Sequence, residues 1–278
     1  MDYGRPIEFG IFVLPDATDR LRPIDAAVRA DELGFELIGT QDHPYQWRFY
    51  DAWTLLTAIA MRTQRIGVFP DVTNLPLRPP AVLAKAAASL DLLSGGRVEL
   101  GLGAGSISDA IRSIGGPVRT GPESVSALEE AIEVIRLMWS GQRGARFDGK
   151  FYQLAGVNTG PMPAHPIGIW LGAYKPRMLA IVGRTADGWV PSLGYLKPED
   201  MPAANARIDE AASQAGRDPS VIRRVLNVGH DLNAEQFAEL AIEHGFDTFM
   251  VSQDLMDHIA TEIAPRVREL VAAHREAR

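Results

Sequence analysis

The sequence predicts one (β/α)8 barrel, an α/β fold that takes up residues 1–278 as a single domain. Short apolar runs typical of buried strands alternate with helical segments along the whole chain. Eight strand–helix pairs can be counted, and 278 residues is an ordinary length for such a barrel. An open doubly wound sheet would show the same alternation, but the eight pairs and the chain length favour closure.

The first part of the chain is expected to contain four strands and three helices. Pro23 near the start of the first helix and Gly34 past its end are typical helix boundaries. Prolines also open the third helix, and Gly95 and Gly96 supply its stop. The expected strands are residues 7–14, 35–40, 65–72 and 98–102, and the expected helices are residues 23–33, 51–61 and 79–93.

The connection between the fourth and fifth strands, residues 106–166, is much longer than normal. Residues 106–121 are irregular with room for one short helix, and residues 147–154 have the pattern of a small hairpin. Between them, Thr120 and Glu123 have the spacing of a capping box that opens a long amphipathic helix. Long insertions at strand ends form lids or substrate walls, so this connection predicts part of the substrate pocket.

The remaining chain repeats the alternation of strand and helix. Glycines at 216 and 245 end two of its helices, and Pro265 predicts a kink in the last one. The expected strands are residues 167–171, 188–191, 223–228 and 247–251, and the expected helices are residues 176–185, 198–215, 234–244 and 255–274.

Composition excludes several classes of function. The net charge is −7 without a basic stripe, which argues against nucleic acid as a partner. Cysteine is absent, so disulfides and thiolate metal sites are excluded and a cytoplasmic location fits. No signal peptide and no membrane-spanning apolar run are expected. The six histidines show no metal-ligand spacing, so no metal site is predicted.

Asp42, His43 and Trp47 follow the second predicted strand. An imidazole at a strand end can exchange protons near neutral pH, an aspartate can orient it, and an indole can stack on a flat ligand. A turn-capping aspartate beside a structural histidine would give the same pattern.

Two glycine-containing loops follow the fourth and fifth strands. Residues 101–105, GLGAG, let a ligand approach the backbone closely, but Ser106 stands where a dinucleotide fingerprint needs glycine. Residues 172–176, GAYKP, join a strand to a helix, whose free N–H groups and dipole favour an anion. An ordinary turn with a surface lysine is the alternative at the second loop.

Several segments together resemble the bacterial-luciferase-like flavin and deazaflavin oxidoreductases. They are DHPYQW (42–47), DVTNLPLRPPAVLAKAAASLDLLSGGRVELGLGAG (71–105), RFDGKFYQLAGV (146–157) and IWLGAYKPRMLAIVGRTADGWVPS (169–192). The resemblance implies a luciferase-like TIM barrel with a flavin-type ring at the carboxyl ends of the strands. It also implies a bulge after the third strand with a cis peptide between Asp71 and Val72. Cofactor contacts then map onto Asp71, Val72, Thr73, Asn74, Gly103, Ala104 and Gly105 for the ring and its ribityl chain, and onto Gly172, Ala173, Tyr174 and Lys175 for the phosphate.

Within that family, the DHxxxW pattern is similar to members that use the deazaflavin coenzyme F420. The resemblance implies hydride transfer with a small organic substrate, His43 as proton relay, Asp42 as its orienter and Trp47 as a pocket wall. An FMN-dependent monooxygenase with a separate reductase and a non-catalytic flavin-binding barrel are the alternatives. Ser106 departs from the sugar-phosphate dehydrogenases of this group, which have glutamate there.

A homodimer is also implied by the resemblance. The apolar helix over residues 53–61 is a candidate contact surface, although packing on the barrel explains its composition equally well.

Overall fold

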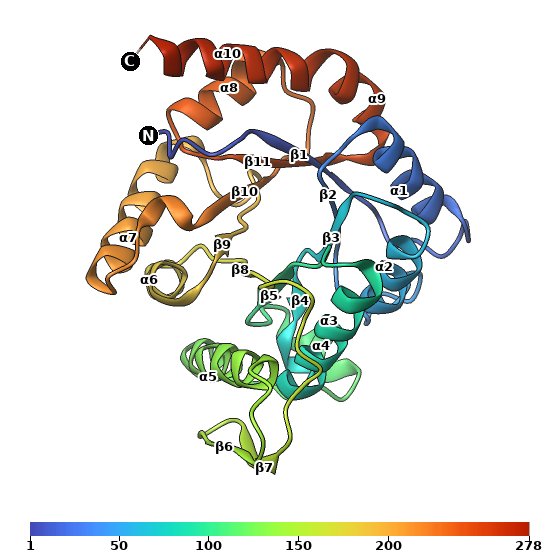
Figure 1. The fold of residues 1–278 in the computed structure, drawn as a ribbon, viewed down its shortest axis with the longest axis vertical. Helices are drawn as coiled ribbons and strands as arrows, with labels where there is room; N and C mark the ends of the chain where they lie inside the picture. Colours follow the sequence, from blue (N-terminus) through green and yellow to red (C-terminus); the bar gives the residue numbers. More distant parts are fainter. Residues whose placement is uncertain (278) are drawn as a thin grey trace.

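A computed structural model describes residues 1–277 and confirms the parallel barrel surrounded by helices (Figure 1). The strands are ordered β3-β2-β1-β11-β10-β9-β8-β5-β4. β3 (Gly67–Pro70) and β4 (Thr73–Asn74) are two parts of the third barrel strand. β4 pairs with β5 (Leu100–Gly103), and a parallel bridge joins Val68 to Val98, so the two ends of the sheet meet.

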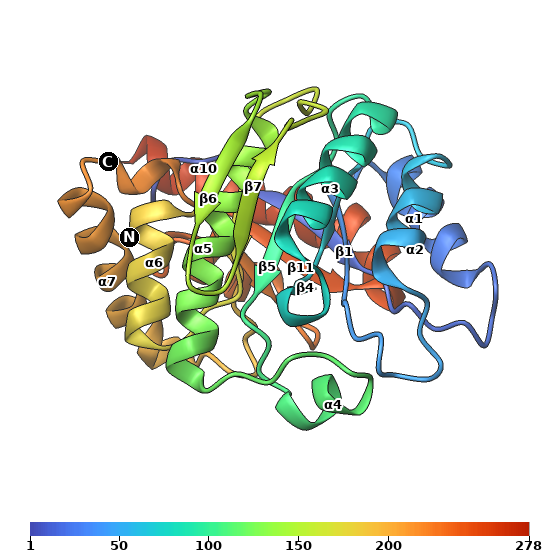
Figure 2. The ribbon, with the colours of Figure 1, turned by 90° about the horizontal axis from the view of Figure 1, so that it is seen from below.

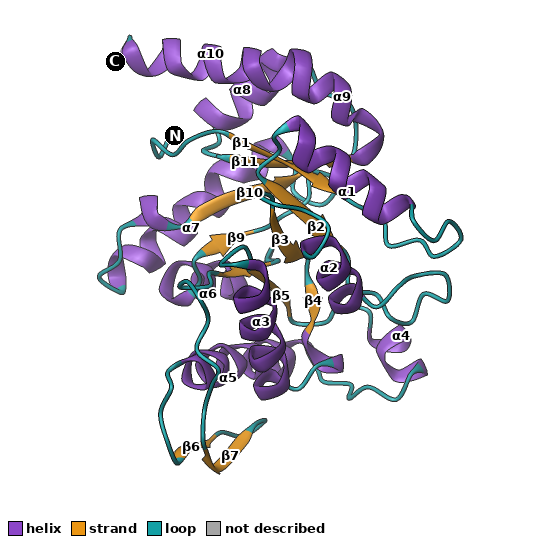
Figure 3. Cartoon of the chain, turned by 45° about the vertical axis from the view of Figure 1, so that its right-hand side comes forward, coloured by secondary structure: helices purple, strands orange, loops and turns teal. Residues whose placement is uncertain are grey.

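Most elements lie where the sequence predicts them, with ends that differ by a few residues (Figure 3). The other barrel strands are β1 (Glu8–Phe12), β2 (Leu37–Thr40), β8 (Ile169–Leu171), β9 (Gly188–Trp189), β10 (Arg223–Asn227) and β11 (Thr248–Ser252). The surrounding helices are α1 (Arg22–Leu33), α2 (Ala52–Ala60), α3 (Pro80–Ser94), α5 (Gly121–Trp139), α6 (Pro176–Thr185), α7 (Met201–Gln214), α8 (Ala234–Ile242) and α10 (Ala264–Glu276).

Local signals explain the helix ends. Gly34 and Gly95 adopt left-handed backbone with φ of 86° and 74°, and each closes its helix by donating to carbonyls of the last turn. The capping box of Thr120 and Glu123 is formed at the start of α5. The last helical region is interrupted as predicted, because a π-helical turn over Ile259–Ile263 separates α9 (Met256–His258) from α10.

Two apolar layers hold the barrel together. Side chains between the strands and the helices form the larger layer, and a smaller cluster fills the barrel interior, namely Leu37, Phe69, Trp170, Val190, Val225 and Met250. Met250 occupies space left by two glycines, since a Cβ at Gly10 would lie 2.5 Å from the Met250 sulfur and one at Gly39 would lie 3.1 Å from its methyl. The interior is therefore packed, and a ligand can enter only above this cluster.

The long connection between β5 and β8 differs from the expected lid. It contains α4 (Ser108–Ser113), the barrel helix α5 and a hairpin of β6 (Ala145–Asp148) and β7 (Gln153–Val157). The hairpin runs along the outside of α5 (Figure 2), and Glu130 of α5 accepts hydrogen bonds from the backbone N–H groups of residues 150–152. The hairpin therefore covers the barrel wall, and only the stretch around α4 and the start of α5 reaches the strand ends.

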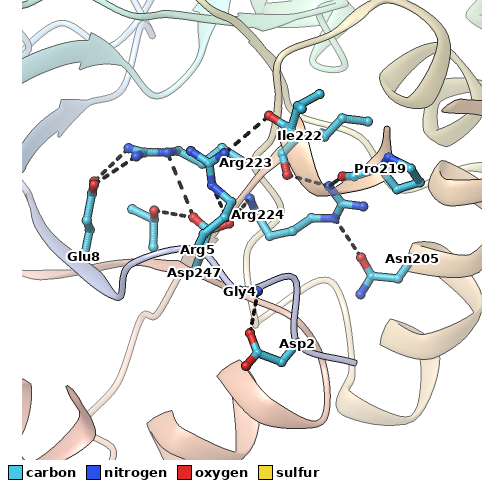
Figure 4. Close-up of polar contacts among 12 residues, drawn as sticks. Asp2, Gly4, Arg5, Glu8, Asn205, Pro219, Ile222, Arg223, Arg224 and Asp247 are labelled. Carbon is cyan, nitrogen blue, oxygen red and sulfur yellow. Dashed lines mark hydrogen bonds and ion pairs between the residues drawn. The ribbon is translucent and has the colours of Figure 1, made fainter. Parts of the chain in front are cut away.

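A polar network closes the amino-terminal end of the barrel (Figure 4). Arg224 is fully buried and donates to Asn205 Oδ1 at 2.9 Å and to Asp209 Oδ1 at 2.7 Å. Arg223 forms two hydrogen bonds with the Glu8 carboxylate, at 2.8 and 2.9 Å. This end is filled by ion pairs, which leaves the opposite end for a ligand.

Across residues 1–277, none of the helices combines the length and apolarity needed to cross a bilayer.

The apolar side chains of α2, which the sequence offered as a dimer contact, are mostly buried, including Trp53, Leu55, Leu56 and Ile59. Packing on the barrel therefore accounts for that helix, and it offers little apolar surface to a second chain.

Candidate functional site

A cavity of about 1250 Å³ lies at the carboxyl ends of the barrel strands. This is the end at which barrels of this type bind their ligands. Thirteen of the fourteen predicted site residues line it: Asp42, His43, Asp71, Val72, Thr73, Asn74, Gly103, Ala104, Gly105, Gly172, Ala173, Tyr174 and Lys175. Within residues 1–277, no group of three or more His, Cys, Asp or Glu side chains is arranged to hold a metal ion.

A backbone bulge between β3 and β4 forms one wall of the cavity. The peptide bond between Asp71 and Val72 is cis, as the sequence resemblance implied. Val72 projects toward β5 and β8, where glycines make room for it. A Cβ at Gly103 would lie 2.9 Å from Val72 Cγ2, and one at Gly172 would lie 3.3 Å from the same atom. Glycine at these positions therefore lets the bulge approach the neighbouring strands.

Asp42 is tied to Arg78. The guanidinium of Arg78 donates to both carboxylate oxygens of Asp42 at 2.7 Å, and the backbone N–H of Asn74 donates to Oδ2 at 3.0 Å. No hydrogen bond joins Asp42 to His43 in the described part of the chain, so the predicted orienting contact is not formed. Asp42 instead anchors the residues that follow the bulge.

The His43 side chain faces the cavity without a hydrogen bond to any other residue in 1–277. Its ring stacks on Tyr45 with the centroids 5.3 Å apart. Burial lowers the pKa of His43, and the negative charge of Asp42 partly opposes that shift. A neutral imidazole at physiological pH can exchange a proton with a ligand.

Trp47 does not line the cavity, which differs from its predicted role as a pocket wall. Its side chain is 88% exposed, and Arg48 lies over its ring at 5.6 Å. Tight turns at residues 43–49 direct it outward, since Gln46 donates to His43 O and Phe49 donates to Gln46 O. Tyr45 lines the cavity at this position instead.

The other end of the cavity is positively charged. The loop 172–175 leads into the amino terminus of α6, and Lys175 and Arg119 line the cavity nearby. Arg119 packs over the rings of Phe151 and Tyr152 at 5.4 and 5.5 Å. The amino terminus of α6 and the cations Arg119, Lys175 and Arg177 of the lining give this part of the cavity a positive potential that would favour an anion.

Sequence reasoning missed several lining residues, including Tyr45, Arg119, Ser192, Tyr195, Asn227 and Ser252. Asn227 is the last residue of β10, so its position at a strand end could have identified it. Arg119 lies in an irregular loop before α5, where no pattern in the sequence indicates the direction of a side chain.

Among the described residues 1–277, four buried polar atoms of the cavity lining lack a hydrogen-bond partner: Asp71 Oδ2, Thr73 Oγ1, Asn74 Oδ1 and Asn227 Oδ1. Unpartnered buried polar atoms cost free energy, so such groups normally mark the place of a missing polar ligand or water. Their grouping beside the bulge indicates a ligand with several polar atoms.

Comparisons with known proteins agree with this geometry. The luciferase-like monooxygenase family matches residues 7–230. The chain is 31% identical to an F420-dependent glucose-6-phosphate dehydrogenase from Nocardia farcinica, over 80% of this chain and 67% of that protein. It is also 31% identical to a 5,10-methylenetetrahydromethanopterin reductase from Archaeoglobus fulgidus, over 76% of this chain and 60% of the reductase.

Solved structures share the fold. An F420-dependent secondary alcohol dehydrogenase, solved with an F420-acetone adduct, superposes with a TM-score of 0.84 over 95% of this chain and 99% of its own, at 17% identity. The family match covers most of the chain, and the barrel fold agrees with it. The chain belongs to the luciferase-like monooxygenase family.

Proposed function

We propose that this enzyme is an F420-dependent oxidoreductase that transfers a hydride between the deazaflavin and a small organic substrate. The observation that carries the proposal is the cavity itself, which combines a bulge wall, a free histidine and an anion-binding region. Relatives named as F420-dependent enzymes, matched over about 80% of this chain, support the choice of cofactor.

The residues present fit such a cofactor. Val72 and the loop 103–105 would flank the ring, where the Thr73 hydroxyl would donate or accept a hydrogen bond and Asn74 Oδ1 would accept one. The loop 172–175 and the start of α6 would hold the phosphate. FMN shares a planar ring and a phosphate, so it is the alternative cofactor.

When bound, F420 supplies a ring carbon that accepts or donates a hydride. His43 would exchange the accompanying proton with the substrate, since its ring is neutral and uses no protein partner. Asp42, paired with Arg78, would hold the end of β2 and the bulge in place beside His43. The packed interior below the cavity excludes water from that side.

We propose a substrate other than a sugar phosphate. Ser106 lines the cavity directly after the glycine loop, at the position where sugar-phosphate dehydrogenases of this group carry glutamate. The serine hydroxyl is a much weaker acid than a carboxyl group, so the same proton transfer is not available here. Glucose 6-phosphate therefore serves as a negative control in substrate screens.

Titration of the purified protein with F420 and with FMN tests the cofactor. We expect quenching of F420 fluorescence with a lower Kd than for FMN. Tight FMN binding without F420 binding would reject the proposal, and oxygen uptake with reduced FMN would then indicate a monooxygenase. Cofactor binding without turnover of any substrate would indicate a non-catalytic barrel.

Replacement of His43 tests the proton relay. We expect His43→Asn to lower turnover by about 10²–10⁴-fold while F420 affinity changes little. The matched control is His258→Asn on the exposed surface of α9, which should leave turnover unchanged. Equal turnover of wild type and His43→Asn would remove His43 from the mechanism.

We further propose a cytoplasmic homodimer. Exposed apolar side chains lie on α3, where Val82 is 66% and Leu93 is 65% exposed. Such side chains are often covered by a second subunit. Light scattering measures the oligomeric state, and a monomer at working concentration would contradict this part of the proposal.

A further inference from the structure

Asp71 lies in the bulge wall, and its carboxyl group has one hydrogen-bond partner within the part of the chain that the structure describes. Asn227 at the end of β10 donates from Nδ2 to Asp71 Oδ1 at 3.1 Å. The second oxygen, Oδ2, is buried and makes no hydrogen bond with residues 1–277. Both residues line the cavity, so the free oxygen belongs to the ligand-binding wall.

No cation compensates a charge at this position. Within residues 1–277, no Lys, Arg or His nitrogen lies within 4.0 Å of the Asp71 carboxyl oxygens. Asp42 lies in the same cavity lining but is paired with Arg78. The two carboxyl groups of the cavity therefore differ in their surroundings: a guanidinium compensates the charge of Asp42, and none compensates that of Asp71.

An ionised carboxylate is costly under these conditions. A buried carboxylate with one hydrogen-bond donor and no cation loses most of its hydration without replacement, so the neutral form is favoured. Burial raises the pKa of Asp71 to about 7, and the hydrogen bond from Asn227 only partly opposes it. The geometry and the pKa agree that Asp71 holds a proton below neutral pH.

We propose that Asp71 is a neutral carboxylic acid in the cavity wall and that its Oδ2–H donates a hydrogen bond to an acceptor atom of the bound cofactor ring. Asn227 would hold the acid in this orientation through its contact with Oδ1. Ionisation of Asp71 removes the donor and places a negative charge beside an electron-rich ring. Cofactor affinity therefore falls as the pH rises through the pKa of this group. The inference rests on the proposed function, because it names a residue of the same binding site.

Other titratable groups face the same space. Tyr174, after β8, has a pKa raised chiefly by burial, with a contribution from the charge of Asp71. His43, after β2, has a lowered pKa, and Lys175 lies in the anion-binding region. Protonation of His43 on the acid side of neutrality would also alter binding, so the pH dependence above neutrality is assigned to Asp71 by substitution.

Cofactor binding as a function of pH tests the inference with three proteins. F420 affinity is measured by fluorescence for wild type, Asp71→Asn and Asp71→Ser between about pH 6 and about pH 9. For wild type, we expect the Kd to rise by up to about tenfold per pH unit above neutrality. Asp71→Asn keeps a donor that does not titrate, so its affinity should stay high and lack this pH dependence. Asp71→Ser should bind weakly at every pH, because its hydroxyl is too short to replace the acid.

His43→Gln serves as the matched control, since it removes the neighbouring imidazole, whose lowered pKa places its titration on the acid side of this range. We expect this variant to keep the wild-type slope of affinity against pH. The same slope in wild type and in Asp71→Asn would overturn the inference. So would loss of the slope in His43→Gln with its retention in Asp71→Asn.

A ligand-free measurement separates this inference from the proposed function. The infrared spectrum of the apoprotein at about pH 6 should contain a protonated carboxyl band that Asp71→Asn lacks. Absence of that band would overturn the inference even if F420 binds. Failure of F420 to bind at any pH would instead reject the proposed function and the ring contact together, whatever the infrared band shows.

Discussion

At the scale of single residues, the cavity depends on how each buried charge is compensated. Asp42 is fully buried and acceptable because Arg78 neutralises it. Among residues 1–277, Asp71 has no such partner, and the ion pair of Glu99, near the other end of the barrel, is a distant one with His165 at 3.9 Å. Burial raises the pKa of Asp71 and that of Glu99 to about 7.

Removal of Arg78 should be costly. We expect Arg78→Met to lower the free energy of unfolding by about 3–5 kcal/mol, because Asp42 is left as an unpaired buried charge. Urea denaturation measures the change. The control is Asp51→Asn, which removes the half-exposed second partner of Arg78 but keeps a capping side chain for α2, and it should cost no more than about 1 kcal/mol. Equal effects of the two substitutions would contradict this assignment.

Glu99 should make stability depend on pH. Its carboxylate accepts from the backbone N–H of Gly168 at 2.6 Å, but burial dominates and raises its pKa from 4.5 to about 7. Between these values the unfolded chain has lost the proton that the folded protein still holds, so stability falls as the pH rises. Glu99→Gln should flatten this part of the stability profile, measured by urea denaturation, whereas the exposed substitution Glu239→Gln should not. A profile unchanged by Glu99→Gln would exclude this cause.

At the scale of elements, Glu130 of α5 fixes the turn of the β6–β7 hairpin, whose Phe147, Tyr152 and Leu154 also pack against the core. This carboxylate accepts three backbone hydrogen bonds, from Lys150, Phe151 and Tyr152, at 2.8 to 3.1 Å. The turn of the hairpin thereby follows α5, the helix whose first turn lines the cavity. The hairpin itself lines no part of the cavity.

Glu130→Ala should loosen the hairpin without affecting binding. We expect faster amide hydrogen exchange at residues 150–152, because their N–H groups lose the carboxylate acceptor. F420 affinity should stay within about twofold, since Glu130 does not line the cavity and the hairpin reaches it through the Arg119 side chain, which packs over Phe151 and Tyr152. Glu133→Ala, an exposed substitution on the same helix, is the control and should leave exchange at residues 150–152 unchanged. A large loss of F420 affinity in Glu130→Ala would mean that the hairpin does take part in binding.

At the scale of the whole molecule, the barrel has one filled end and one open end. The polar network around Arg224 joins α7, β10 and β11 at the amino-terminal end, and the carboxyl-terminal Arg275 holds Asp2 at 2.7 Å (Figures 1 and 4). Segments far apart in the sequence thus meet at the filled end, which leaves the opposite end for the ligand.

Loss of the network should destabilise the whole barrel. We expect Arg224→Met to lower the free energy of unfolding by about 3–5 kcal/mol, because the buried Asn205 and the partly buried Asp209 lose their donor. Arg207→Met, on the exposed side of α7, should change stability by no more than about 0.5 kcal/mol. Thermal unfolding followed by circular dichroism measures both. A small effect of Arg224→Met would show that the network fills space without stabilising the barrel.

Most of the fold could be predicted because its signals are local. Prolines, glycines and capping residues mark the helix ends, and α6 was predicted to the residue. Predictions that depend on which way a side chain points were less accurate. Trp47 faces solvent, and Asp42 binds Arg78 instead of His43. Of the long connection after β5, the stretch around α4 and the start of α5 lines the cavity, whereas the hairpin covers α5.

Periodicity predicts the barrel, and the rule that parallel strands present their carboxyl ends at one rim predicts where a ligand should bind. Most of the thirteen predicted site residues that line the cavity were implied by the resemblance to the luciferase-like family. The partners of the buried carboxyl groups, in contrast, could be identified only in the folded chain. Arg78 lies 36 residues from Asp42, and Asn227 lies 156 residues from Asp71. Such pairings form between loops that are distant in the sequence, and they determine which carboxyl groups of the cavity wall have a partner.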